Sequence, residues 1–153
     1  MSAQWQETPQ IRRMLPADLD AVVAVEREVF LFPWTRGNFS DSLDSGYHCR
    51  VLEQAGHIFG YGVMTIGADE AHLLTLSIAA GWQRHGWGEK LLQQFIRVAR
   101  EHHAQSMFLD VRESNQAAAR LYERIGFRHI ARRKDYYPAM GGREDSLIME
   151  LTL

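Results

Sequence analysis

The chain has 153 residues, a formal net charge of −2 and a hydrophobic content of 46%. These values suit one compact globular domain and exclude a nucleic-acid binder held mainly by a basic field. Its one cysteine, Cys49, excludes an intramolecular disulfide. No apolar run approaches membrane-spanning length, and residues 1–10 lack the basic and apolar regions of a signal peptide, so by default we expect a cytoplasmic protein.

The first part of the chain predicts a short strand and two helices. Residues 11–15 form a candidate strand that Pro16 ends. A helix follows, because apolar residues from Leu19 to Phe30 are spaced to bury one side. Proline disfavours helical geometry in the residue before it. We therefore expect residues 32–35 to break this helix and Thr35 to cap a second one.

Three strands are predicted next. Residues 54–57, Gln-Ala-Gly-His, are typical of a hairpin turn between the first two of them. Gly60 and Gly62 lie inside the second strand, which indicates a bulge or a close backbone approach. The three strands are placed at residues 47–52, 58–66 and 71–78.

The second half of the chain alternates helices with strands. We expect a helix from Gly86 to His103, and another that Asn115 caps and Gly126 ends. Residues 136–138, Tyr-Tyr-Pro, are expected to form a loop between the two closing strands. The predicted strands cover residues 107–111, 127–131 and 147–151. This order predicts an α/β fold of mixed α+β topology, with a mixed central sheet of about six to seven strands flanked by about four helices. No repeat or linker divides the chain, so we expect one domain over residues 1–153 with its core at about 11–151.

A glycine-rich turn joins the strand ending at Ile78 to the following helix. Residues 83–88, Gln-Arg-His-Gly-Trp-Gly, combine two glycines with a cation. The first N–H groups of a helix lack intrahelical partners, and the helix dipole adds partial positive charge there. Glycine leaves these donors open to an anion, so the turn predicts a phosphate site. Leu91 occupies the position where a dinucleotide fingerprint requires its third glycine, and no glycine precedes Gly88 at the spacing of a Walker loop.

This turn resembles the acetyl-CoA signature of the GCN5-related N-acetyltransferases, Q/R-x-x-G-x-G/A, through Gln83, Gly86 and Gly88. The helix that Asn115 opens resembles the next signature of that family, because Tyr122 lies seven residues further on and Gly-Phe follows the helix. Segments at residues 32–35, 136–138 and 142–145 narrow the resemblance to one subfamily, the bacterial ribosomal-protein-alanine N-acetyltransferases. The resemblance runs from about residue 11 to residue 151.

The resemblance implies the acyl-CoA N-acyltransferase fold, with acetyl-CoA as co-substrate and no metal. Backbone groups of the strand before the turn would bind the acetyl and pantetheine parts. The turn would hold the pyrophosphate, and an asparagine would reach the pantetheine arm. These cofactor-binding residues are Leu76, Ser77, Ile78, Arg84, His85, Gly86, Trp87, Gly88, Glu89 and Asn115.

The resemblance also implies two catalytic residues. The family has a glutamate as proton acceptor at the position of Asp110, and a tyrosine as proton donor at Tyr122. Asp110 is one methylene shorter than that glutamate, so the base acts directly or through a bridging water. The base needs to remove only a weakly held proton, because a free α-amine has a pKa of roughly 7.7–8.0 and is partly deprotonated at neutral pH. In this reaction the amine attacks the thioester directly and forms a tetrahedral intermediate. No covalent acyl-enzyme is required, so Cys49 needs no role.

The subfamily resemblance implies the substrate as well. It would be the N-terminal alanine of a small-subunit ribosomal protein, the eighteenth in the standard naming, presented as a peptide that begins Ala-Arg. No membrane and no direct nucleic-acid partner is expected. Because the peptide is basic, acidic residues are expected to border its groove. The candidates are Glu26, Glu28, Asp69, Glu70, Glu144 and Asp145.

Other interpretations stay open from the sequence alone. One is an acetyltransferase of the same fold that acts on lysine or small amines, and another is a module that binds acetyl-CoA without chemistry. Asp110 is also compatible with a capping or ion-paired role, and Tyr122 with core packing. Tyr136 and Tyr137 suit either a peptide groove or the packing of a loop.

Overall fold

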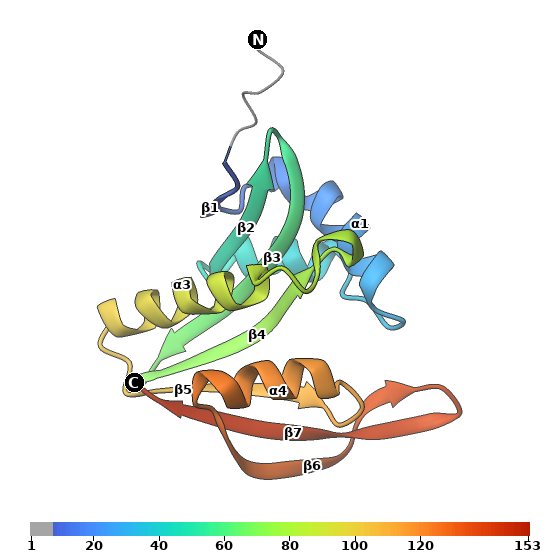
Figure 1. Cartoon of the computed structure of the whole chain (residues 1–153), viewed down its shortest axis with the longest axis vertical. Helices are drawn as coiled ribbons and strands as arrows, with labels where there is room; N and C mark the ends of the chain where they lie inside the picture. Colours follow the sequence, from blue (N-terminus) through green and yellow to red (C-terminus); the bar gives the residue numbers. More distant parts are fainter. Residues whose placement is uncertain (1–7) are drawn as a thin grey trace. The chain divides into compact units, whose positions relative to one another are not determined.

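The computed structural model describes residues 8–153, which form a mixed sheet of seven strands with four α-helices (Figure 1). The predicted α/β class is therefore confirmed. Residues 1–7, which make up most of the N-terminal stretch in the signal-peptide argument, lie outside the described residues. Within residues 8–153, no helix is long and apolar enough to cross a membrane.

The helices and strands lie close to their predicted positions, apart from the last two strands. The hydrogen-bonded order of the strands is β1-β2-β3-β4-β5-β7-β6. The strands are β1 (Gln10–Arg13), β2 (His48–Gln54), β3 (His57–Gly67), β4 (Glu70–Ile78), β5 (Ser106–Arg112), β6 (Arg128–Ala139) and β7 (Gly142–Thr152). The helices are η2 (Pro16–Asp18), α1 (Leu19–Val29), α2 (Arg36–Asp44), η3 (Ala80–Trp82), α3 (Trp87–Glu101) and α4 (Gln116–Ile125), of which η2 and η3 are 3-10 turns.

The chain divides into two compact units. The first combines the residues up to Val63 with Thr75–Gln93, and the second combines Met64–Leu74 with Gln94–Leu153. The first unit thus holds β1, β2, α1 and α2 together with the end of β4 and the start of α3. The second holds β5, β6, β7 and α4.

In the first unit, α2 is capped at its first turn and packed into the core. Thr35 caps α2 as predicted, because its Oγ1 accepts the N–H of Asn38 at 3.1 Å. Phe39 follows in the same helix and is fully buried. Its ring lies 5.1 Å from that of Trp34 and 5.5 Å from that of Tyr61, measured between centroids. These aromatic contacts attach α2 to the core of the first unit.

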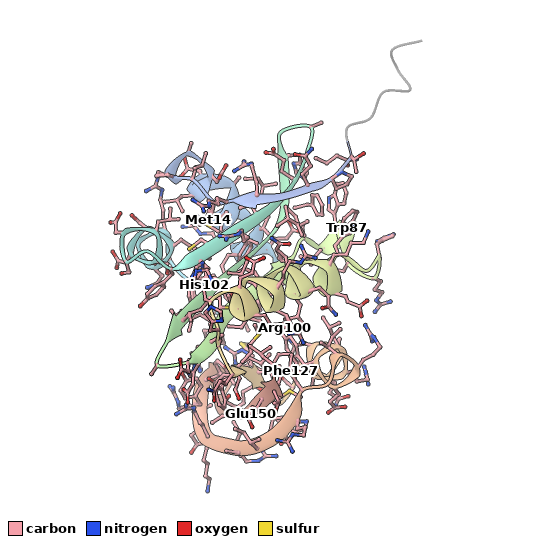
Figure 2. The ribbon with its side chains drawn as sticks, turned by 90° about the vertical axis from the view of Figure 1, so that its left-hand side faces the viewer. Met14, Trp87, Arg100, His102, Phe127 and Glu150 are labelled. Atoms are coloured by element: carbon pink, nitrogen blue, oxygen red, sulfur yellow. The ribbon has the colours of Figure 1, made fainter. Side chains whose placement is uncertain are left out.

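Cys49 lies in β2 and is 3% exposed. Its backbone C=O accepts the N–H of Met14, labelled in Figure 2, at 3.0 Å. Burial raises the pKa of the Cys49 thiol to about 11. The thiol is therefore protonated at neutral pH and belongs to the apolar core.

The predicted hairpin turn between β2 and β3 is confirmed. Ala55 and Gly56 have φ values of 49° and 80°, as the two central residues of a type I′ turn require. The close approach predicted for Gly60 is also confirmed. A Cβ there would lie 2.9 Å from side-chain atoms of Leu52 and Ile78, and 3.2 Å from the C=O of Ser77. Glycine thus lets β3 approach the end of β4 that carries Ser77 and Ile78.

The second unit is built on β5. This strand pairs in parallel with β4, from Glu70↔Ser106 to Leu73↔Leu109, and antiparallel with β7 along its whole length. Its buried residues alternate, so one face lies in the core. α4 follows β5 in the chain (Figure 1). It runs from its Asn115 cap to Gly126, where φ is 121° and a Cβ would lie 3.3 Å from the Leu151 side chain of β7. The buried β5 residues are Met107, Leu109 and Val111.

The prediction of a loop at residues 136–138 is wrong. β6 and β7 form one long hairpin (Figure 1), in which Tyr137 pairs with Glu144 and Pro138 with Arg143. The strands continue because a bulge between Arg133 and Tyr137 absorbs the irregular residues, with Asp135 at a φ of 52°. β6 is the edge strand of the sheet, where proline is tolerated.

We predict that Phe39→Ala lowers the free energy of unfolding by about 3–5 kcal/mol, because the change leaves a cavity between two aromatic rings. Leu31→Ala is the matched control. This side chain is 68% exposed, so the change should stay within about 0.5 kcal/mol. Urea unfolding of the two variants measures both values, and equal losses would contradict the role given to Phe39.

Candidate active site

The turn that precedes α3 contains two residues in the left-handed backbone conformation. Arg84 and Gly86 have φ values of 64° and 84°, and α3 begins at Trp87, labelled in Figure 2. The C=O of Gly86 accepts the N–H of Lys90 at 3.1 Å, so the N–H groups before Lys90 precede the regular helical bonds. When residues in left-handed and right-handed helical conformations alternate, successive backbone N–H groups point into one concavity that can bind an anion. The residues predicted to bind pyrophosphate, 84–89, all lie in this turn and in the first turn of α3.

Aromatic packing holds this turn in place. The ring of Trp82 stacks on Phe59 with centroids 4.0 Å apart, and Trp87 meets the same ring edge-on at 5.5 Å. The side-chain amide of Gln83 donates to the C=O of Ile78 at 2.9 Å. The signature glutamine therefore links the turn to the end of β4. Sequence reasoning missed Phe59 and Trp82, because no local pattern relates a β3 residue to this turn.

Leu76, Ser77 and Ile78 form the end of β4. They lie past Leu73, the last β4 residue that pairs with β5. Ser77 and Ile78 are buried, whereas Leu76 is half-buried. The N–H of Ala79, the next residue, donates to the C=O of Phe59 at 2.7 Å. The three predicted residues thus lie in ordered backbone directly before the anion-type turn.

A buried carboxylate lies next to this part of β4 in the first unit. Glu26 is 2% exposed and accepts the N–H of Trp34 at 2.8 Å and the hydroxyl of Tyr61. Tyr61 is also hydrogen-bonded to the side chain of Ser77. Burial raises the pKa of Glu26, and these two donors only partly oppose that effect. Glu26, one of the acids expected to border a peptide groove, is therefore enclosed by the first unit.

In the second unit, Asp110 lies on β5 with both of its hydrogen bonds on one oxygen. Oδ1 accepts the hydroxyl of Ser146 at 2.7 Å and the Nε–H of Arg133 at 3.1 Å. Oδ2 has no partner among the described residues, and the side chain is 31% exposed. A carboxylate held at one oxygen and open at the other is suited to accept a proton from a bound amine or water. Sequence reasoning missed Ser146 and Arg133, which reach Asp110 only through strand pairing.

Tyr122 lies on α4, and its ring is 7% exposed. The ring packs against Phe127, labelled in Figure 2, with centroids 5.7 Å apart. Burial, followed by the nearby Tyr137, raises the pKa of Tyr122 to about 12. Its hydroxyl has no hydrogen-bond partner among residues 8–153. It stays protonated at neutral pH and keeps its proton available to a ligand.

Tyr137 links the two predicted catalytic residues of the second unit. It interacts electrostatically with Tyr122 and is hydrogen-bonded to Ser146. Ser146 in turn bonds Asp110. Burial raises the pKa of Tyr137 to about 12 as well. Asp110 is therefore connected to Tyr122 through the side chains of Ser146 and Tyr137.

Asn115 caps α4 as predicted, with Oδ1 accepting the N–H of Ala118 at 3.2 Å. This leaves the Nδ2 donor for a ligand. The turn that contains Asn115 is attached to the hairpin through Glu144, which accepts the N–H of Ser114 at 3.1 Å and pairs with Arg112 at 2.7 Å. The guanidinium of Arg112 also lies 4.5 Å from the ring centroid of Tyr137.

Arg132 forms ion pairs with two further acidic residues, Glu113 at 2.8 Å and Asp145 at 2.9 Å. The other oxygen of Asp145 accepts the N–H of Asp135 in the β6 bulge at 2.9 Å. Glu144 and Asp145, two of the acids expected to border a peptide groove, are thus both paired with arginines. Among residues 8–153, no group of three His, Cys, Asp or Glu side chains is placed to hold a metal ion.

Comparison with known proteins agrees with this geometry. The model of the acetyltransferase (GNAT) family matches residues 19–127. The [ribosomal protein bS18]-alanine N-acetyltransferase of Escherichia coli strain K12 is 34% identical over 136 residues, which are 89% of this chain and 92% of that protein. The crystal structure of the ribosomal-protein-S18-alanine N-acetyltransferase from Escherichia coli has a TM-score of 0.89 at 32% identity, over 95% of this chain and 94% of that one.

A more distant structure shares the fold alone. It is the PaiA N-acetyltransferase from Thermoplasma acidophilum in complex with coenzyme A, with a TM-score of 0.79 at 17% identity, over 95% of this chain and 99% of that one. The family match covers more than half of the chain, and the sequence identity to the Escherichia coli enzyme extends over nearly all of it. The chain belongs to the acetyltransferase (GNAT) family.

Proposed function

We propose that this acetyltransferase transfers acetyl from acetyl-CoA to the N-terminal alanine of a ribosomal protein, the bS18 type named for its Escherichia coli relative. The observation that carries the proposal is Asp110, whose Oδ1 is held by two donors while Oδ2 is open. A binding module without chemistry has no need for such a carboxylate connected through Ser146 and Tyr137 to a buried, protonated phenol.

Acetyl-CoA is the proposed co-substrate. The pyrophosphate binds to the turn at residues 84–89, where the left-handed φ values of Arg84 and Gly86 support an N–H concavity. Backbone groups of Leu76, Ser77 and Ile78 bind the acetyl and pantetheine parts, and the Nδ2 of Asn115 donates to the pantetheine arm. Support for this ligand also comes from the distant fold relative solved with coenzyme A.

The proposed reaction is direct attack of the amine on the thioester carbonyl. A terminal α-amine has a pKa of roughly 7.7–8.0, against about 10.4 for a lysine side chain. A partly exposed carboxylate is therefore a sufficient base for the terminal amine, acting directly or through one water. As the tetrahedral intermediate collapses, the C–S bond breaks and the Tyr122 hydroxyl protonates the departing thiolate.

Gly86→Val is predicted to weaken acetyl-CoA binding by at least about tenfold. At Gly86 φ is +84°, a conformation in which a β-branched residue is strained. Gly81→Ala is the control, because its Cβ would meet nothing within 4 Å and its φ is ordinary. Calorimetry of both folded variants measures the affinities, and unchanged binding by Gly86→Val would remove the phosphate site from this turn.

Tyr122→Phe is predicted to lower turnover by about 10²–10⁴-fold, the usual contribution of a positioned proton donor. Acetyl-CoA affinity should stay the same, because only a hydroxyl is lost. Steady-state kinetics and calorimetry separate the two effects. Normal turnover in this variant would assign thiolate protonation to water or to another group.

The pH dependence of turnover tests the same residue. The rate should rise as the substrate amine loses its proton near roughly pH 8. It should then stay level up to about pH 10, because Tyr122, with a pKa raised to about 12, keeps its proton throughout that range. A fall in rate between about pH 8 and 10 in the wild type that is absent from Tyr122→Phe would show that the phenol ionises earlier than its burial implies.

The substrate is tested with two peptides and mass spectrometry. One begins Ala-Arg with a free terminus, and the other is the same peptide blocked at its N-terminus and carrying one internal lysine. We expect faster acetylation of the free terminus, because its amine is more readily deprotonated. A blocked peptide without lysine is the control for background transfer. Equal rates on the first two peptides would defeat the terminal-alanine proposal and leave the family assignment unchanged.

A further inference from the structure

Ser146 is a fully buried polar residue in β7, with 0% exposure. Strand pairing places it between Arg112 of β5 and Arg133 of β6. Residues two apart on a strand share a face, so Asp110, two residues before Arg112, lies on the same face as Ser146. The hydroxyl is thus directed to the one carboxylate of β5.

The Ser146 hydroxyl has a single proton, which it donates to Oδ1 of Asp110 at 2.7 Å. Tyr137 also interacts with the Ser146 side chain. The serine is therefore enclosed beside Tyr137 and directs its only proton to the carboxylate of Asp110.

Arg133 also binds Oδ1 of Asp110, at 3.1 Å, but its side chain is 52% exposed. Solvent screens such a pair, and the flexible arginine loses conformational freedom in forming it. A hydrogen bond from a buried donor to a charged acceptor is less screened and more strongly directed. Of the two restraints on Oδ1, Ser146 is the stronger.

We propose that Ser146 is a positioning residue for Asp110, and this inference rests on the proposed role of Asp110 as the base. A general base acts only within hydrogen-bond reach of the proton that it removes, so a displaced carboxylate acts less effectively. By holding Oδ1, Ser146 keeps Oδ2 in a single orientation for the water or amine. Ser146 touches no reacting atom and acts only through Asp110.

Ser146→Ala tests the proposal first by kinetics. We expect kcat for a peptide with a free N-terminus to fall by roughly tenfold, within the ~10²-fold that ~1 Å of misplacement costs. The acetyl-CoA dissociation constant should not change. Ser42→Ala is the matched control, because Ser42 is 4% exposed and its hydroxyl donates to the C=O of Asn38 in α2 at 2.9 Å. It should leave kcat unchanged.

The same substitution in an Asp110→Asn background separates positioning from a general loss of structure. If Ser146 acts through the base, Ser146→Ala should change kcat by less than about twofold where the base is already absent. An equal tenfold loss in both backgrounds would overturn the proposal, because the effect would then not depend on Asp110. A wild-type kcat in Asp110→Asn would overturn it as well, together with the role of Asp110 as base.

A structural measurement keeps the inference distinct from the choice of substrate. In a crystal structure of Ser146→Ala, we expect the Asp110 side chain to occupy more than one rotamer or to leave its original position. If Asp110 keeps its single rotamer with Oδ1 in place, Ser146 does not position it, whatever amine the enzyme acetylates. A displaced Asp110 supports the inference even if the terminal-alanine substrate proves wrong.

Discussion

In the second unit, the pair of Arg112 and Glu144, whose side chains are only 22% and 19% exposed, is the least screened of the ion pairs that connect the turn before α4 to the β6–β7 hairpin. Arg112 pairs with Glu144 at 2.7 Å, and Arg132 joins Glu113 to Asp145 at 2.8 and 2.9 Å. These pairs connect the turn before α4 to the start of β7. The arrangement keeps Asn115, Tyr137 and the strand that carries Ser146 in a fixed relation. A side chain of Asp110, only 31% exposed, can then be held by bonds from two neighbouring strands.

The first unit fixes its binding turn by different means. Phe59 is stacked on Trp82 at 4.0 Å, and the side-chain amide of Gln83 donates to the C=O of Ile78. Aromatic packing and this hydrogen bond therefore attach the turn to β3 and to the end of β4.

Local signals in the sequence were enough to predict much of the fold. The cap at Thr35, the hairpin turn at Ala55-Gly56 and the helix end at Gly126 each depend on a few adjacent residues, and all three are confirmed. Long-range contacts were not predictable in the same way. Ser146 lies 36 residues from Asp110, and only the β5–β7 register brings them together. The prediction of a loop at residues 136–138 was wrong because a bulge lets the strand continue past Asp135. The hydrophobic pattern of the sequence does not reveal such a bulge.

The sequence alone does not show how an acidic side chain is buried or paired. Glu26, Glu144 and Asp145 have the same side-chain chemistry in the sequence, yet one is enclosed and the other two are paired with arginines. The distinction depends on burial and on partners far along the chain. The two predicted catalytic residues were found through motif resemblance, and the side chains that hold Asp110 were found only in the folded strands.

The buried thiol of Cys49 has a consequence for an enzyme that meets thioesters. Thioesters exchange readily with thiolates, so a reactive cysteine would draw acetyl groups onto the protein itself. With a pKa of about 11, about one thiol in ten thousand is ionised at neutral pH, and burial at 3% exposure keeps even that fraction away from solution. The only cysteine of the chain is thus protected against self-acylation, and a cysteine introduced on the surface would be the single site for a thiol-directed label.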